Sequence, residues 1–348
     1  MASEDSNRVV GVALCGFGRA GQIHFHGIRQ NHHARLKYVV DMIGEEGVLE
    51  RIAGCLAEYH MTHVQPVSKE QFDEIVLKDP EVEAVVVATP TDSHEYYVRR
   101  ALEAGRGVFC EKPIAGNIRD VSACYDIAEK NGRPLYCAFN RRFDAGMRNV
   151  YNQVRAGKIG RVYQIKTCSR DSPLPSLAYL KISNGMFHDC AVHDIDMVCW
   201  VVGEQPVKVM AEGSAFDEGI RSIGDVDTVA IILKFPSGVI ATIDLNRHSS
   251  YGYDQRLEVL GEKGMLRVEN VSEDSVSLSA NGGVTMKPLL YSFPQRYEAA
   301  YRLELDHFIT LLRDPTQPSC VTREQTLLAT RVADACEVSL KEGRAVDL

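Results

Sequence analysis

The fold is decided by the stretch Val9-Val10-Gly11-Val12-Ala13-Leu14-Cys15-Gly16-Phe17-Gly18-Arg19-Ala20-Gly21. Its first half is an apolar run typical of a buried strand, and its second half is a Gly-x-Gly-x-x-Gly pattern that opens a helical segment. In that context the glycines permit a tight turn and close approach of the backbone to a pyrophosphate, which the helix N-terminus attracts. The loop residues predicted to bind the cofactor are Gly16, Phe17, Gly18, Arg19, Ala20 and Gly21. The stretch therefore predicts a dinucleotide-binding Rossmann unit.

Asp41 supplies a second signal, because it ends a predicted strand at residues 36–40 and lies twenty residues beyond Gly21. A carboxylate at this position can accept hydrogen bonds from the adenosine ribose hydroxyls, and Met42 is predicted to contact the cofactor beside it. Residues 42–46 contain no base to hold a 2′-phosphate and two acids to repel it. The segment therefore favours NAD over NADP. The alternative interpretation of Asp41 is a solvated turn aspartate.

The first 139 residues alternate β-rich runs with helical patterns, which indicates βαβ units and a doubly wound parallel sheet. The predicted strands are residues 9–15, 36–40, 82–88, 108–110 and 135–139. The predicted helices are residues 22–30, 45–59, 93–104 and 118–130. We therefore predict an α/β fold with a Rossmann domain at residues 1–139.

The pattern changes after Arg141, where helices and clustered strands replace the regular alternation. The predicted helices are residues 150–155 and 186–202, and the predicted strands are residues 161–168, 228–235, 239–245 and 256–260. Pro236-Ser237-Gly238 suits a hairpin turn. Strands in a block predict an open, mostly antiparallel sheet with helices on one face. Residues 140–348 are thus predicted to form an α+β domain for substrate binding and oligomerisation.

Composition excludes some classes of binding partner for this protein. The net charge of −8 and a pI near 5.8, without a long basic run, argue against nucleic acid and anionic membranes. No apolar stretch approaches the roughly 20 residues that span a bilayer, and the N-terminus does not resemble a signal peptide. The 10 cysteines show no C-x-x-C pair and are interpreted as reduced core thiols. We expect a cytoplasmic protein with a small-molecule substrate.

Two further strands are predicted to end at the edge where open α/β sheets bind ligands. The residues predicted to contact the cofactor there are Thr89, Pro90, Thr91, His94, Glu111 and Lys112. His94 either touches the nicotinamide half or lies in the first turn of a solvated helix. The ammonium of Lys112 can hydrogen-bond a substrate hydroxyl and lower the pKa of neighbouring acids.

The second domain carries a cluster of acids and histidines at residues 186–196. Asp189 and His193 are four residues apart, so on an α-helix both side chains share one face. Oxidation of an alcohol requires a base for the hydroxyl proton, and a neutral histidine suits that task. Acids complementing the helix dipole or a satisfied core histidine are the structural alternatives. A metal site is disfavoured because the two histidines, five apart, do not share a face.

These motifs together resemble the Gfo/Idh/MocA oxidoreductases over nearly the whole chain. The resemblance rests on the glycine loop, on residues 88–94, 110–113 and 140–144, and on the segment with Asp189 and His193. The segments 169–173 and 250–256 resemble those of family members that act on inositols. Residues 173–176 are less proline-dense than in many such members, and His188 stands where arginine or another residue is common.

The resemblance implies that Lys112, Asp189 and His193 form a catalytic triad. His193 would take the hydroxyl proton of myo-inositol, Lys112 would hydrogen-bond that oxygen, and Asp189 would orient the substrate or His193, while NAD accepts hydride and a keto-inositol forms. The residues that the resemblance assigns to the polyol are Arg141, Arg170, Asp171, Tyr251 and Tyr253. The two tyrosines could instead be alternating strand positions.

The same resemblance implies a homodimer or homotetramer, formed by pairing the open sheets of the second domains. It also implies that a C-terminal helix at about residues 322–340 packs back on the first domain. A dehydrogenase of another sugar or cyclic diol, or a catalytically silent dinucleotide-binding regulator, is the alternative function. The sequence assigns no role to His24, His26 or His188.

Overall fold

The computed structural model describes residues 8–41 and 47–348, so the predicted cofactor residue Met42 lies outside the described residues. The chain divides into two compact units. The first comprises Met1–Phe139 and Tyr301–Leu327, and the second comprises Asn140–Ala300 and Leu328–Leu348. The predicted boundaries differ from this division because they assign residues 301–327 to the second domain.

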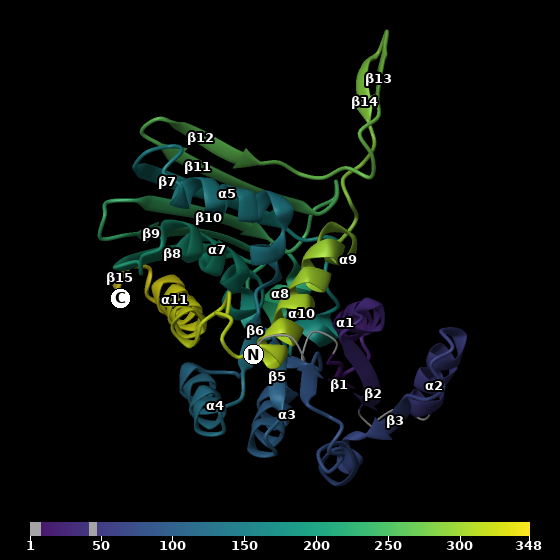
Figure 1. Cartoon of the computed structure of the whole chain (residues 1–348). Helices are drawn as coiled ribbons and strands as arrows, with labels where there is room; N and C mark the ends of the chain where they lie inside the picture. The colour runs from purple at the N-terminus through teal and green to yellow at the C-terminus, as the bar shows by residue number, and fades with distance from the viewer. Residues whose placement is uncertain (1–7, 42–46) are drawn as a thin grey trace. The chain divides into compact units, whose positions relative to one another are not determined.

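The first unit contains a six-stranded parallel sheet with the order β3-β2-β1-β4-β5-β6 (Figure 1). Its strands are β1 Val10–Cys15, β2 Ala34–Asp41, β3 Gln65–Ser68, β4 Ala84–Val87, β5 Gly107–Glu111 and β6 Leu135–Ala138. Its helices include α1 Arg19–Gln30, α2 Val48–Glu58, α3 Thr91–Glu103 and α4 Ile118–Lys130. The direction of winding reverses between β1 and β4, which is the order of dinucleotide-binding sheets. The predicted Rossmann fold is confirmed.

Aromatic packing explains why residues 301–327 belong with the first unit. Helix α10 Glu298–Arg313 brings Phe308 edge-on to Phe109 of β5, with ring centroids 5.7 Å apart. The first turn of α11 Arg323–Glu342 is tied to the same unit by a 2.9 Å hydrogen bond between Thr326 and Tyr125. These contacts join segments far apart in sequence, so local patterns do not reveal them.

The second unit contains a seven-stranded mixed sheet with the order β12-β11-β7-β10-β9-β8-β15. The strands are β7 Val162–Arg170, β8 Lys208–Ser214, β9 Thr228–Lys234, β10 Ile240–Asn246, β11 Asp254–Gly261, β12 Gly264–Val268 and β15 Val346–Asp347. Only β7 and β10 pair in parallel among the described strands of this sheet, which confirms the mostly antiparallel prediction. The predicted turn at Gly238 joins β9 to β10, with φ of 95°.

Helices α5 Ala145–Arg155 and α7 Val192–Val202 cover one face of this sheet (Figure 1). Shorter helices complete the second unit: α6 Leu177–Leu180, α8 Glu218–Ser222 and α9 Phe293–Arg296. The other face of the sheet exposes Ile232, Ile240 and Leu260 by 49%, 40% and 41%. This face is therefore open in the single chain.

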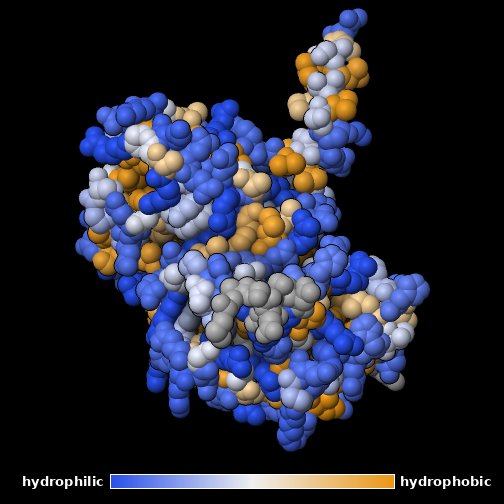
Figure 2. Space-filling model, viewed as in Figure 1, coloured by the Kyte–Doolittle hydropathy of each residue, from blue (hydrophilic) through white to orange (hydrophobic). Residues whose placement is uncertain are grey.

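A small hairpin, β13 Ser277–Ala280 with β14 Gly283–Met286, projects beyond the sheet and was not predicted from the sequence. Figure 2 shows apolar side chains along it, and Val276, Leu278 and Val284 are each more than half exposed. No helix in the described part of the chain is long and apolar enough to cross a membrane.

Substitution of a glycine in β1, compared with one in α2, tests how closely β1 is packed. A Cβ on Gly11 would lie 1.8 Å from the carbonyl oxygen of Glu81, whereas a Cβ on Gly54 of α2 would meet no atom within 4 Å. Gly11→Ala should lower the free energy of unfolding by about 1–3 kcal/mol through overpacking. Gly54→Ala should raise it by roughly 0.5–1 kcal/mol through helix propensity. Urea unfolding followed by circular dichroism measures both, and equal effects would contradict the packing argument.

Candidate active site

The loop after β1 has the geometry of a phosphate-binding turn. Gly16 has a φ of +92°, and a Cβ there would lie 2.5 Å from the carbonyl oxygen of Ala88. A Cβ on Gly21 would lie 2.1 Å from the carbonyl oxygen of Gly16, so both positions require glycine. A Cβ on Gly18, the N-cap of α1, would meet no atom within 4 Å. Space is therefore open at the helix N-terminus, where an anion is stabilised.

Asp41 lies at the carboxyl end of β2 and is tied to this loop. Its Oδ2 accepts a 2.8 Å hydrogen bond from the backbone N–H of Phe17. Phe17 in turn packs edge-on against Phe25, with centroids 5.4 Å apart. Arg19 is exposed, and Ala20 is half-buried within the first turn of α1. The carboxylate thus fixes the loop as well as standing where an adenosine ribose would bind.

His94 connects the two loops that follow β4 and β5. The ring is 2% exposed, and Nδ1 lies 2.7 Å from the carbonyl oxygen of Pro113 while Nε2 lies 2.8 Å from that of Thr89. His94 therefore lies in the first turn of α3, as one of its two interpretations has it, but its side chain is buried rather than solvated. Pro90 is the N-cap of α3 and Thr91 is its first residue, so the predicted Thr-Pro-Thr turn lies at the expected sheet edge.

Glu111 ends β5 directly before Lys112, and its Oε1 lies 2.7 Å from Nε2 of His24. Burial alone would raise the pKa of Glu111, but the hydrogen bond with His24 and the nearby charges of His24 and Lys112 outweigh burial and lower it. His24 is itself 1% exposed. The contact with Glu111 accounts for one histidine that the sequence left without a role. His26, by contrast, packs its ring against Phe25.

The first unit therefore fits a dinucleotide at the carboxyl edge of its sheet. The close glycine turn, the open helix N-terminus at Gly18 and the carboxylate of Asp41 all follow β1 and β2. Strands β1 and β4 are neighbours there, at the point where the winding reverses. The predicted residues Thr89, His94 and Glu111 follow or end β4 and β5 at that edge.

In the second unit, Asp189 and His193 lie on one continuous helical segment whose first part is wider than an α-helix. Phe187–Ala191 is a π-helical turn that runs into α7. Turns of this type occur often at functional sites. His188 in the same turn lies 3.1 Å from Asp334, which gives it a structural partner.

Asp189 is held by two residues that the sequence analysis missed. The hydroxyl of Tyr179 donates to its Oδ1 over 2.8 Å, and Nη1 of Arg247 donates to its Oδ2 over 2.9 Å. Arg247 is fully buried. Neither residue belongs to a short motif, because Tyr179 precedes Asp189 by ten residues and Arg247 follows it by fifty-eight.

Arg141 is likewise engaged on the α7 side of the sheet. Its Nη1 lies 2.9 Å from Oδ2 of Asp194 and donates to Oγ of Ser169 over 3.1 Å. Burial lowers the pKa of Arg141, but the charge of Asp194 outweighs it and the net shift is upward. Its neighbour Arg142 forms a second buried pair with Asp196. Arg141 is thus a fixed cation next to the helix that carries His193.

The predicted polyol residues fall into two groups. Tyr253 is buried, packs edge-on with Tyr297 at 6.0 Å, and lies near enough to Arg141 and Asp171 for their charges to act on its phenol. Asp171 accepts the backbone N–H of Ser172 over 2.8 Å.

Arg170 follows Ser169 along β7, so their side chains point to opposite faces of the sheet. Arg170 donates to the hydroxyl of Tyr251 over 3.0 Å and to Asp244 over 2.9 Å. Tyr251 in turn donates to Asp254 over 2.6 Å. The structure therefore does not bring Arg170 and Tyr251 together with Arg141.

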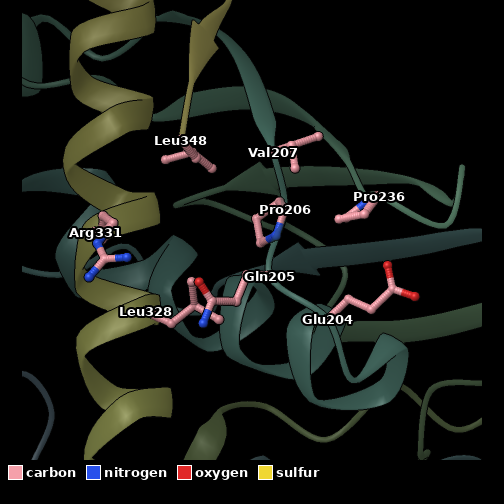
Figure 3. A pocket seen from close by; sticks show the side chains of 8 residues that line it. All are labelled: Glu204, Gln205, Pro206, Val207, Pro236, Leu328, Arg331 and Leu348. Carbon is pink, nitrogen blue, oxygen red and sulfur yellow. The ribbon is translucent and has the colours of Figure 1, made fainter.

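A cavity of about 400 Å³ lies elsewhere in the second unit (Figure 3). Its lining residues are Glu204, Gln205, Pro206, Val207, Pro236, Leu328, Arg331 and Leu348. None of the predicted site residues lines it. Within residues 8–41 and 47–348, no three His, Cys, Asp or Glu side chains are grouped as metal ligands would be.

Comparison with known proteins assigns a family model to a segment of each unit. Residues 10–139 match the family described as "Oxidoreductase family, NAD-binding Rossmann fold", and residues 147–267 match the "GFO/IDH/MocA C-terminal domain". The chain is 35% identical to a myo-inositol 2-dehydrogenase of Thermotoga maritima over 97% of this chain and 98% of that protein.

Solved structures of similar proteins share this fold over nearly the whole chain. A putative myo-inositol dehydrogenase from Sinorhizobium meliloti 1021 superposes with a TM-score of 0.90 at 34% identity, covering 97% of this chain and 99% of that one. A scyllo-inositol dehydrogenase from Lactobacillus casei, with bound NAD(H) and scyllo-inositol, superposes with a TM-score of 0.86 at 26% identity, covering 98% and 99%.

The buried position of His94 predicts a pH dependence of stability. Burial lowers its pKa below the ordinary value of 6.5, despite the two carbonyl contacts. The unfolded chain therefore takes up a proton that the folded chain does not, and the stabilisation is lost as pH falls below about 6.5. The free energy of unfolding of the wild type should exceed that of His94→Gln by about 1 kcal/mol at pH 7.5. This difference should become smaller as the pH falls toward 5. Urea unfolding at several pH values across this range measures the difference in free energy of unfolding. His63→Gln, at an exposed histidine, serves as the control. A difference that does not change with pH would contradict the role given to buried His94.

Proposed function

Because the chain belongs to the Gfo/Idh/MocA oxidoreductase family, we propose that it is an NAD-dependent dehydrogenase that oxidises one hydroxyl of a cyclic polyol, with myo-inositol as substrate and 2-keto-myo-inositol as product. The observation that carries the proposal is the helical segment with Asp189 and His193, in which Asp189 is anchored by Arg247. The names of relatives at 29–35% identity over nearly the whole chain support an inositol as substrate.

The proposed reaction assigns one task to each group. NAD, when bound, accepts the hydride at its nicotinamide ring. His193 takes the hydroxyl proton as the C–H bond of the same carbon breaks and its electron pair leaves as hydride, so that a C=O bond remains. Lys112 hydrogen-bonds the reacting oxygen and stabilises its developing negative charge. Asp189 orients the substrate or His193.

Recognition of a polyol requires donors and acceptors in fixed positions, because a wrong epimer leaves buried polar groups unpaired. We assign this role to Arg141, Asp171 and Tyr253. Arg141 is already held by Asp194, so its position does not depend on the substrate. For Arg170 and Tyr251 we propose an indirect role, because their partners Asp244 and Asp254 lie with them on the opposite face of the sheet.

We also propose that the protein forms a homodimer or homotetramer through the open face of the seven-stranded sheet. Ile232, Ile240 and Leu260 expose apolar surface there in the single chain. Apolar surface of this kind often marks a contact between subunits.

Lys112→Ala provides the first test. We expect the purified wild type to form NADH with myo-inositol, and the variant to lose at least about 100-fold in kcat, because the reacting oxygen loses its charged partner. The Kd for NAD, measured by calorimetry, should change little. The matched control is Lys78→Ala, an exposed lysine of the same unit, which should keep full activity. Unchanged kcat in Lys112→Ala would remove Lys112 from the mechanism.

A panel of inositols, pentoses, hexoses and cyclic diols with both cofactors separates the alternatives. NADH formation with a sugar or cyclic diol but with no inositol would replace the substrate assignment. NAD binding without turnover of any compound would instead favour a dinucleotide-binding regulator.

Asp41 allows a sharper test of cofactor choice. Asp41→Asn keeps an oxygen that can accept the Phe17 N–H but removes the charge that repels a 2′-phosphate. Asp41→Ala removes both. We expect roughly tenfold weaker NAD binding in Asp41→Ala, since a charge-assisted hydrogen bond and the ribose contacts are lost. Asp41→Asn should gain NADP binding while losing less NAD affinity. A wild-type preference for NADP would overturn the argument.

A further inference from the structure

We propose that Tyr179 and Arg247 are positioning residues that hold the two carboxylate oxygens of Asp189 in one orientation, so that Asp189 acts as a fixed anionic acceptor rather than as the base. The inference rests on the proposed function, because it concerns the dehydrogenase reaction at His193. It assigns two residues that lie outside every motif of the sequence.

Tyr179 approaches Asp189 from the short helix α6. Its hydroxyl donates to Oδ1 over 2.8 Å, and its backbone N–H is capped by Ser176. Burial and the charge of Asp189 both raise the pKa of Tyr179, so the phenol keeps its proton and remains a donor at neutral pH. Tyr179 is 41% exposed as a residue, and its hydroxyl is directed at the carboxylate.

Arg247 approaches the other oxygen from the end of β10. Nη1 donates to Oδ2 of Asp189 over 2.9 Å, and Nη2 donates to Oδ2 of Asp225 over 3.4 Å. A fully buried guanidinium requires anionic partners, because an unpaired buried charge is costly. Arg247 therefore needs Asp189 as a carboxylate, and its own backbone N–H is fixed by a 2.8 Å bond to the carbonyl oxygen of Asp227.

Donors on both oxygens fix the plane of the Asp189 carboxylate. A carboxylate has about four acceptor positions, so further hydrogen bonds from a substrate hydroxyl or from His193 remain chemically open to it. Taking a proton would weaken the bond from Arg247, so Asp189 is a poor general base in this setting. Cys190 and Asp225 contact the same arginine as Asp189, and His193 and Asp194 are the ionisable groups that follow on α7.

Tyr179→Phe is the most direct test, because it removes one donor and leaves the buried charges in place. We expect kcat to fall about tenfold and the acid limb of the kcat/KM pH profile to move to higher pH. That limb reports the base His193 together with any carboxylate that must stay charged, and Asp189 with one donor fewer is easier to protonate and more negative toward a neighbouring base. The KM for NAD and the Tm should stay near wild type. Tyr291→Phe, at an exposed tyrosine, is the matched control and should change nothing.

Arg247→Lys and Arg247→Met form the second arm. The lysine variant should show a larger upward move of the acid limb than Tyr179→Phe, and the methionine variant a larger one still, provided that circular dichroism shows both to be folded. If neither folds, Tyr179→Phe alone decides. An unmoved acid limb and unchanged kcat in Tyr179→Phe would overturn the proposal, leaving the network a purely structural one.

Carbon-13 NMR of the aspartate carboxyl groups separates this inference from the proposed function. The Asp189 resonance, assigned with Asp189→Asn, should titrate at higher pH in Tyr179→Phe than in wild type. This result is expected even if wild type oxidises none of the polyols tested, in which case the proposed function fails and the clamp on Asp189 stands. Identical titration of Asp189 in both proteins refutes the clamp, whatever the activity.

Discussion

The near contact between Gly16 and Ala88 is the constraint on which the first unit depends. Strands β1 and β4 are neighbours, and the chain leaves their carboxyl ends through loops that pass each other with no room for a Cβ at Gly16. Only a residue that tolerates a φ of +92° and has no side chain fits there. That turn sets the start of α1, and with it the place where a pyrophosphate can approach.

The loops around this turn are tied together by polar contacts that do not use the cofactor. Asp41 accepts the Phe17 N–H, and His94 spans the carbonyl groups of Thr89 and Pro113. In each contact, a residue predicted to bind the cofactor also holds a loop in place. Residues of this edge therefore carry two tasks, and pre-formed loops reduce the ordering that a ligand must otherwise impose.

Local patterns predicted the fold better than they predicted the site. Strand runs, the glycine loop and the turn at Gly238 depend on neighbours in sequence, and the structure confirms them. The partners of Asp189 are different in kind, because Tyr179 and Arg247 come from other elements and carry no spacing signal. The α-helical spacing assumed for Asp189 and His193 was also too simple, since a π-helical turn precedes α7.

The acids before and within α7 have partners that local sequence does not reveal. Asp189, Asp194 and Asp196 each face an arginine from another element. Buried ion pairs add little net stability compared with apolar packing, but breaking one leaves an uncompensated charge. The main effect of these ion pairs in this unit is therefore to fix the positions of the side chains. The proposed polyol substrate would offer many similar hydroxyls, and a site tells such groups apart only if its own charged groups are already fixed. Three arginine–carboxylate pairs along one helical segment hold their side chains in place without any ligand.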